Sequence, residues 1–372
     1  MKASISWIHV GDLHMDAADA WASLPRLGAI VDEINAHALA ADFLFLPGDN
    51  ANHASPDQYA AIVGALSRLE RPWRAIPGDH DFEGGSLAAY ETAFAAANRP
   101  EVEVFAGHRC IFVDVVSAGA GGPDFRVTPH HFSRIGRELS RAHASGQTPL
   151  VFVHTYPGDL SAGGDALAGL FAEAHVAFVD TGHTHYNELL NDGRVVYGAT
   201  RSTAQIEEGD GMPGFSIVCV HDAVPSWRFR LIGAAWPHVQ IIAPCDLRLV
   251  TRPADSRQIP RPGQVCVAAR LFGETSDTMF AAIDEGPRVA MNRVEGGWWE
   301  AQVEVSNQGL HRLVVACGTV HDRVDFLVRD ADFTPKRLAP VALGHAVHAV
   351  GEWPAAGLAG LQLGPNRNGG DW

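Results

Sequence analysis

Polar clusters that follow short apolar runs constrain the fold of this chain more than any other feature of its sequence. Five such clusters occur in the first half of the chain, each where an apolar, β-like run ends. In an open α/β sheet, the segments after the strand ends lie together along one edge and form binding sites. We therefore expect the following clusters to meet at one sheet edge: Asp12-Leu13-His14, Gly48-Asp49-Asn50, Gly78-Asp79-His80-Asp81, His154 and Gly182-His183-Thr184-His185.

The side chains in these clusters are mostly carboxylates and imidazoles, which are metal ligands. A carboxylate can bridge two cations whereas an imidazole binds one, so a mixed set of this size suits a dinuclear centre. Asp12 and His14 are separated by one residue, which places both side chains on the same side of an extended strand end. A mixed oxygen and nitrogen set favours Mn, Fe, Zn or Co over Ca, which prefers oxygen ligands alone. The pattern predicts hydrolysis at phosphorus.

The first part of the chain alternates between β-like runs and helical patterns. In the segment Pro56–Leu69, apolar side chains recur on one helical face, and Ser55 before Pro56 supplies an N-cap. This alternation predicts a layered α/β domain. The strands that we expect in it are Ser4–Val10, Asp42–Leu46, Trp73–Ile76, Cys110–Val116, Leu150–His154, Val176–Asp180, Val195–Tyr197 and Phe215–Val220.

The pattern changes after about residue 238, where helical periodicity is missing. About seven short β-like segments follow, separated by turns with Gly, Pro or Asp, and they predict an Ig-like or fibronectin-like sandwich. Trp298 and Trp299 are adjacent, so they point to opposite faces of a strand and one of them is expected in the core. We predict a catalytic domain at 1–236, an all-β sandwich at 237–332 and an extended C-terminal tail at 333–372. The tail either frays or docks through Leu361, Leu363 and Trp372.

Composition narrows the class of protein. At 372 residues, two domains are expected, and the formal net charge of -15 disfavours a nucleic-acid polymer as partner. Metal ions would offset that charge locally, so a small anionic substrate is compatible with it. The five cysteines lack metal or redox spacing, and no segment resembles a signal peptide or a membrane span. We therefore expect a cytoplasmic protein that does not bind membranes.

The clusters follow the pattern D-x-H, G-D, G-N-H-[DE], H and G-H-x-H over about residues 4 to 220. In this respect the chain resembles the calcineurin-like metallophosphoesterase superfamily, and within it the class III cyclic-nucleotide phosphodiesterases. The resemblance implies a four-layer α/β/β/α sandwich with two divalent metals at the strand ends, Mn or Fe first and Zn or Co as alternatives.

The resemblance also assigns roles to residues. A metal-bound hydroxide would attack phosphorus in line, and His80, held by Asp81, would act as general acid toward the leaving oxygen. Asp49 would bridge both metals. The first metal would be held by Asp12, His14 and His185, and the second by Asp79, His154 and His183.

Two departures from the family pattern affect the expected substrate. Asp79 stands where the pattern has Asn, so two divalent cations, Asp12, Asp49, Asp79 and a hydroxide sum to about zero charge. A less positive centre favours a monoanionic diester over a dianionic monoester, and it predicts a more alkaline optimum. The second departure is the segment Gly48-Asp49-Asn50-Ala51-Asn52, which lacks the Asp-Arg-Gly extension that the resembled protein phosphatases carry there, so protein phosphatase activity is not expected.

Three further positions are candidates for substrate contact, namely Asn50, His53 and Arg201. Solvated loop residues explain the first two equally well, and a structural salt bridge is the alternative for Arg201. The leading hypothesis is a phosphodiesterase acting on a small phosphodiester or phosphate ester. The alternatives are a phosphomonoesterase of a small organophosphate and a catalytically silent metal-binding scaffold. A homodimer through the sandwich or the tail is the expected protein partner.

Overall fold

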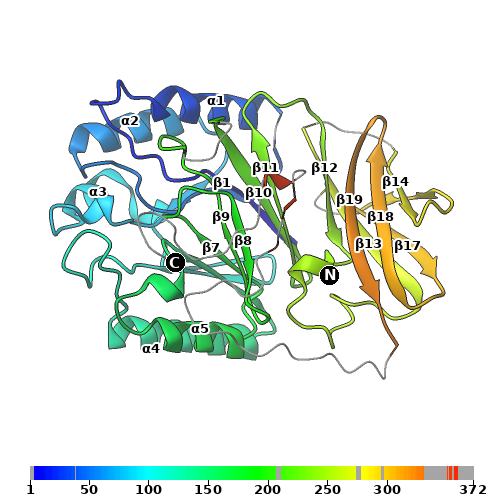
Figure 1. Cartoon of the computed structure of the whole chain (residues 1–372). Coiled ribbons are helices and arrows are strands. Elements are labelled where there is room, and N and C mark those ends of the chain that lie inside the picture. The colour runs from blue at the N-terminus through cyan, green and yellow to red at the C-terminus, as the bar shows by residue number, and fades with distance from the viewer. Residues whose placement is uncertain are drawn as a thin grey trace.

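The computed structural model describes residues 4–37, 39–206, 211–273, 278–294, 297–330, 350, 352–353 and 356–358. Two β-sheets form its α/β part (Figure 1). The five-stranded sheet has the order β11-β10-β1-β2-β3 and the six-stranded sheet has the order β4-β5-β6-β7-β9-β8. The strands are β1 Ser4–His9, β2 Phe43–Leu46, β3 Trp73–Ala75, β4 Val102–Phe105, β5 His108–Val113, β6 Thr148–Val153, β7 Phe178–Thr181, β8 Glu188–Asn191, β9 Val196–Ala199, β10 Gly214–His221 and β11 Val224–Leu231.

The central strands of both sheets are parallel. In the first sheet β1, β2 and β3 run in the same direction, and in the second β5, β6, β7 and β9 do so. The strand β2 is buried along its whole length, as expected for a parallel strand covered on both faces. Because these strands are parallel, their carboxyl ends lie along the same edge of each sheet.

Helices cover the outer faces of the two sheets (Figure 1). They are α1 Ser23–Ala36, α2 Pro56–Leu66, α3 Ala88–Ala93, α4 Pro129–Ala144 and α5 Gly164–Glu173. The helix α2 begins at Pro56, and Ser55 and Gln58 form a reciprocal capping box before its first turn. Short 3₁₀ turns lie at η1 His80–Phe82, η2 Ala96–Asn98, η3 Pro157–Asp159 and η4 Leu247–Leu249.

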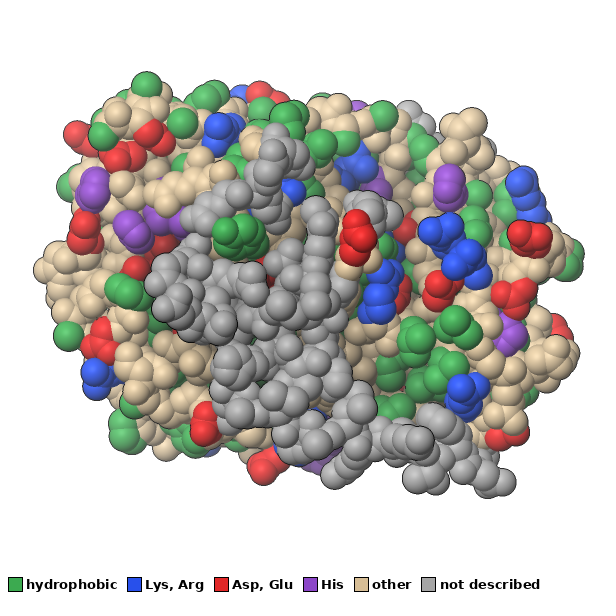
Figure 2. Space-filling model, in the orientation of Figure 1, with side chains coloured by type: hydrophobic (Ala, Val, Ile, Leu, Met, Phe, Trp, Pro, Cys, Tyr) green, Lys and Arg blue, Asp and Glu red, His purple; other side chains and the backbone are tan. Residues whose placement is uncertain are grey.

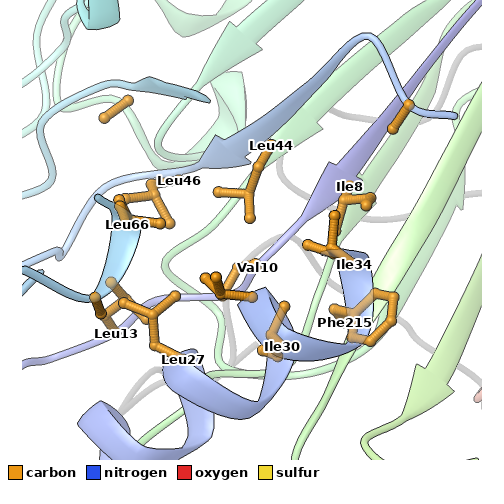
Figure 3. Close-up of a cluster of buried hydrophobic side chains, with 14 of the residues drawn as sticks. Ile8, Val10, Leu13, Leu27, Ile30, Ile34, Leu44, Leu46, Leu66 and Phe215 are labelled. Carbon is orange, nitrogen blue, oxygen red and sulfur yellow. The ribbon is translucent and has the colours of Figure 1, made fainter. Parts of the chain in front are cut away.

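Three apolar clusters hold the α/β part together. The first joins α1 and α2 to the five-stranded sheet, and Figure 3 shows Leu27 and Ile30 of α1 facing Val10 and Leu13. The second lies between the two sheets and is rich in aromatic rings. The third packs α4 and α5 onto the six-stranded sheet. Each sheet is therefore buried on both faces, which fixes where its strand ends lie.

Two further four-stranded sheets follow, with the orders β12-β13-β17-β16 and β15-β14-β18-β19. A cluster of buried apolar side chains lies between them and includes Trp299. Trp298 belongs instead to the cluster shared with α1, so both tryptophans are buried rather than one. The strands are β12 His238–Ala243, β13 Gly263–Phe272, β14 Phe280–Ile283, β15 Val289–Ala290, β16 Asn292–Arg293, β17 Trp298–Val305, β18 Gly309–Cys317 and β19 Val320–Val328.

Buried polar contacts join the C-terminal sheets to the α/β part. Arg228 of β11 pairs with Asp322 of β19 at 3.0 Å, and the guanidinium of Arg270 donates to Ser6 Oγ at 2.6 Å. The ring of Trp353 lies against Arg228 and Arg248, with the guanidinium carbons 4.1 and 3.5 Å from its centre. A short stretch around Trp353 therefore packs where the two parts meet. Leu361, Leu363 and Trp372 lie outside the described residues.

The surface carries charged side chains of both signs, and the thiols are reduced. In Figure 2, histidine side chains gather beside acidic ones at the upper left, on the α/β part. The five cysteines are free, and four of them are buried. Among the described residues, no helix is long and apolar enough to cross a membrane.

Candidate dinuclear metal centre

The expected ligands lie where parallel strands end. The strand β1 leads to Asp12 and His14, β2 leads to Asp49, and β3 leads to Asp79. In the other sheet, β6 leads to His154 and β7 leads to His183 and His185. Both sheets therefore contribute, and the site lies where their carboxyl edges meet.

All seven side chains come together in two groups. Within each group, one potential ligand atom from every residue lies within 4.8 Å of the others, and every member is buried. Asp49 belongs to both groups. The first group is Asp12, His14, Asp49 and His185, and the second is Asp49, Asp79, His154 and His183.

The two carboxylate oxygens of Asp49 face different groups. Oδ2 lies 3.5 Å from His14 Nε2, whereas Oδ1 lies 3.5 Å from His154 Nε2. In the first group, His14 Nε2 also lies 2.8 Å from His185 Nε2. In the second, Asp79 Oδ1 lies 3.2 Å from His154 Nε2 and 3.5 Å from His183 Nδ1. This is the arrangement that a carboxylate shared by two cations requires.

The donor set fits a pair of metal ions. Asp12 Oδ1 is buried without a hydrogen-bond partner among the described residues, although a buried carboxylate oxygen normally has one. The Nε2 atoms of His14 and His185 also lie close together. Where both atoms carry the lone pair of a neutral ring, the two lone pairs face each other with no proton between them. A divalent cation would satisfy both the carboxylate oxygen and the two lone pairs.

Three glycines make room for the ligands. A Cβ placed on Gly48 would lie 2.3 Å from His154 Nδ1, and one on Gly78 would lie 2.2 Å from Asp49 Oδ1. A Cβ on Gly182 would lie 2.4 Å from Asp12 Oδ1. These distances are far below van der Waals contact, so only glycine allows the backbone to pass this close.

Burial and close neighbours shift the pKa values in the site. Burial raises the pKa of Asp49, but the charge and hydrogen bond of His154, together with His14, hold that pKa below its ordinary value. Burial also raises the pKa of Asp79, but His154 and His183 lower it further, so that this pKa lies below its ordinary value. Burial and then His14 lower the pKa of His185 to about 3. Asp49 and Asp79 are thus carboxylates at neutral pH, and His185 is a neutral imidazole that can bind a cation.

Comparison with known proteins agrees with this geometry. The family model of the calcineurin-like phosphoesterases matches residues 6–187, which is a little under half of the chain. Residues 6–187 form a calcineurin-like phosphoesterase domain. The family implies metal-dependent hydrolysis of phosphoesters. A comparison with curated proteins gave no match.

The solved structures that this chain resembles share little sequence with it. A dimetal phosphatase from Danio rerio is 10% identical, with a TM-score of 0.51 over 61% of this chain and 96% of that one. The inner-membrane-complex anchor GAP50 of Plasmodium is 15% identical, with a TM-score of 0.46 over 63% of this chain and 87% of that one. At such identities the likeness to the phosphatase concerns the fold alone.

His80 of the phosphoesterase domain lies beside the two ligand groups. Its backbone N–H donates to Asp49 Oδ1 at 2.9 Å, and its ring packs edge-on against His14 with centroids 4.6 Å apart. Burial lowers the pKa of His80, but Asp49 and the carbonyl of Asn52 outweigh it and raise that pKa above its ordinary value. A protonated ring is what a general acid needs.

Asp81 does not hold His80, contrary to the expectation from the family pattern. The ring Nδ1 of His80 contacts the carbonyl of Asn52 at 2.9 Å instead. The buried carboxylate of Asp81 accepts from Gly78 N at 3.0 Å, from Asn50 Nδ2 at 2.9 Å and from the hydroxyl of Tyr59 at 2.8 Å. Asp81 therefore links the loops that contain Gly78 and Asn50 to α2, because Tyr59 belongs to that helix.

The three candidate substrate residues occupy different environments. Asn50 is fully buried and its amide also donates to the carbonyl of Ile76, so its position does not support substrate contact. Arg201 is buried as well, donates to the Met212 carbonyl at 2.9 Å and lies over the ring of Phe229. His53 is exposed and pairs with Glu83 at 2.8 Å. Of the three, His53 alone is open to solvent.

Phe125 is a site residue that the sequence did not suggest. Its ring packs against His183 and His154 with centroids 4.8 and 5.8 Å away, and it is buried. Phe125 follows a glycine-rich loop, and such a loop has no sequence pattern that would indicate a contact with a metal ligand. It holds the two imidazoles of the second group on an apolar surface.

Proposed function

We propose that this protein is a phosphodiesterase that depends on two divalent metal ions. The observation that carries the proposal is Asp49, whose two oxygens face two separate groups of buried ligands. One carboxylate shared in this way serves a pair of cations better than it serves either a single cation or a purely structural ion pair.

The reaction chemistry divides between the metal ions and the protein. Two bound cations would lower the pKa of water and neutralise charge on the phosphate oxygens. The protein supplies the proton for the leaving oxygen, because His80 Nδ1 is engaged with Asn52 and Nε2 remains to donate. The buried Phe125 and the imidazoles that it contacts keep the second group on a dry surface, which strengthens electrostatic effects there.

Asp79 favours diesters over monoesters. Two divalent cations carry four positive charges, and the three carboxylates Asp12, Asp49 and Asp79 leave one of them uncompensated. With Asn in place of Asp79, two would remain. A dianionic monoester gains more from the more positive centre than a monoanionic diester does.

Metal reconstitution tests the proposal directly. The metal-free protein is loaded separately with Mn²⁺, Fe²⁺, Zn²⁺ and Mg²⁺, and hydrolysis of a bis-aryl phosphate is compared with that of a mono-aryl phosphate. We expect faster turnover of the diester with at least one transition metal. Turnover of the monoester alone would favour a phosphomonoesterase, and no turnover with any metal would favour a silent metal-binding scaffold.

Asp79→Asn tests the charge argument. We expect the ratio of diesterase to monoesterase activity to fall, because the centre gains one positive charge while an oxygen ligand is kept. The exposed Asp32, which pairs with Arg68, provides the matched control Asp32→Asn, which should keep the wild-type ratio. A ratio unchanged in Asp79→Asn would contradict the argument.

Several finer features belong to the same proposal. The order helices, sheet, sheet, helices supports a four-layer α/β/β/α sandwich, and two packed antiparallel sheets support an Ig-like identity for the C-terminal part. Mn or Fe is the preferred metal pair. A cytoplasmic location, the absence of nucleic-acid and membrane partners, and a homodimer through the sandwich or the tail stay predictions.

A further inference from the structure

Asn52 contacts two imidazoles of the site at once. It lies in the loop between β2 and α2, where its side-chain Oδ1 is 3.1 Å from His14 Nδ1. Its main-chain carbonyl oxygen is 2.9 Å from His80 Nδ1. One residue therefore meets a candidate metal ligand through its side chain and the candidate general acid through its backbone.

Neighbours fix which way the amide of Asn52 points. Nδ2 lies 2.9 Å from the carboxylate of Asp16 and 3.0 Å from Nε2 of His53. The carboxylate is an acceptor, and the His53 ring presents an acceptor Nε2 because its Nδ1 donates to Glu83 at 2.8 Å. Both amide protons are thus used, and Oδ1 must face His14.

The orientation of the amide determines what His14 can do. Because Oδ1 is an acceptor, His14 Nδ1 carries the proton and Nε2 carries the lone pair. That Nε2 is the atom directed at Asp49 and His185. By the same reasoning, the carbonyl of Asn52 places a proton on Nδ1 of His80 and leaves Nε2 for proton transfer.

The loop that carries Asn52 is itself anchored to α2. Asp16 also accepts from Gln58 Nε2 at 3.2 Å, and Gln58 belongs to the capping box that begins the helix. The hydrogen bonds thus run from the first turn of α2 through Asp16 to Asn52 and then to His14. A ligand supported from a rigid element in this way keeps its orientation when no metal is bound.

We propose that Asn52 is a positioning residue of the metal centre, whose side chain fixes the tautomer and the direction of His14. This inference rests on the proposed function, since it assumes that His14 binds a metal ion. Partners that orient a ligating histidine typically contribute about tenfold to a hundredfold to metal affinity. The backbone contact with His80 does not depend on the side chain, so a substitution at position 52 separates the two roles.

Titration calorimetry with Mn²⁺ on the full metal-free chain tests the proposal. Wild type should bind two ions, and Asn52→Leu should bind one of them about tenfold to a hundredfold more weakly. Asn52→Asp keeps an acceptor oxygen for His14 Nδ1 but loses the amide donor to Asp16, so it should recover part of the lost affinity. The matched control is Asn35→Leu on α1, because Asn35 donates to the carbonyl of Arg68 and accepts from Glu70 N, neither of which is a ligand residue.

The outcomes separate this inference from the function on which it rests. Wild-type Mn²⁺ affinity at both sites of Asn52→Leu would overturn the inference alone. An equal loss in Asn35→Leu would also overturn it, because the effect would then come from general destabilisation. If wild type bound neither Mn²⁺ nor any of the other three cations used in the reconstitution, the inference and the proposed function would both fall.

Discussion

Four candidate ligands stand on left-handed backbone, which side chains other than glycine seldom adopt. The positive φ angles are 38° at His14, 49° at Asp49, 69° at His183 and 63° at His185. Strained backbone of this kind persists where the surrounding structure compensates for it, and it gathers at functional sites. At these four positions the chain turns sharply after a strand, which directs the ligand atoms inward.

Gly48→Ala tests how tightly the ligand loops pack. Gly48 has φ of 114°, and a Cβ there would meet His154 Nδ1 at 2.3 Å and Gly78 N at 2.8 Å. We expect His154 to be displaced, Mn²⁺ affinity in calorimetry to fall, and the free energy of unfolding to drop by about 1–3 kcal/mol. The control Gly64→Ala lies inside α2 with open space around it and should stabilise the protein by about 0.5–1 kcal/mol. Equal effects at both positions would contradict the packing argument.

At the residue scale, sequence predicted the ligands better than their supports. The ligands follow strand ends, so a local pattern of apolar runs and polar residues finds them. The partners of Asp81 and Arg201 depend on which loops meet in three dimensions. The family pattern assigns Asp81 to its neighbour His80, yet the carboxylate of Asp81 accepts from Gly78 N and from the hydroxyl of Tyr59. Adjacency along a chain gives no information about such contacts.

At the scale of elements, the capping box of α2 supports both the helix and the site. Ser55 accepts from Gln58 N, and the Gln58 side chain returns to the backbone of Ser55. Ser55→Ala should lower the free energy of unfolding by about 1 kcal/mol in chemical denaturation. Because Gln58 also holds Asp16, we expect a small loss of Mn²⁺ affinity in the same variant. A substitution that left both quantities unchanged would show that the box does not support the helix.

The strand β5 contains a buried histidine that predicts acid sensitivity. Burial lowers the pKa of His108 to about 4 from 6.5. Below pH 6.5 the unfolded chain takes up a proton that the folded chain refuses until about pH 4, so stability falls as the pH drops through this range. At pH 5 the loss from this residue is about 2 kcal/mol relative to pH 7.

Denaturation of wild type and His108→Gln at pH 7 and pH 5 measures that contribution. Glutamine keeps a polar side chain but does not titrate, so the variant should lose about 2 kcal/mol less than wild type between the two pH values. Other groups titrate in both proteins and cancel in the difference. An identical pH dependence in the two proteins would exclude His108 as the cause.

Strands that are buried along their whole length were predictable from the sequence, whereas short strands at a sheet edge were not. The strand β2 is an unbroken apolar run because both of its faces are covered. In contrast, β4 leaves Val104 exposed at a sheet edge. Short or mostly polar elements receive their structure from their neighbours rather than from their own composition.

At the scale of the whole molecule, the ion pair of Arg228 and Asp322 joins the two parts of the chain. Both side chains are buried, so Asp322→Ala leaves a buried guanidinium without its counter-charge and should cost about 3–5 kcal/mol. The matched control is Asp325→Ala on the same strand, where the pair with Arg312 is exposed and its loss should cost much less. Chemical denaturation measures both, and similar losses would contradict a coupling role for Asp322.

The resemblance to a known family ended near residue 220, and so did most of what sequence could say about the whole molecule. The C-terminal strands were expected from their turns, but their attachment to the α/β part was not. Trp298 shows why, because it packs with Phe272 and Ile242 against the cluster of α1 rather than facing solvent. Packing between distant parts leaves no periodic trace in a single sequence.

The position of β10 affects how the chain can fold during its synthesis. This strand follows the last metal ligand in sequence, yet it lies beside β1 and pairs with it from Ser4 to His9. While a ribosome is still translating, β1 has β2 on one flank and an open row of backbone amides on the other. The open edge of β1 is therefore paired only after His221 has emerged, and until then its free backbone groups can pair with strands of other chains.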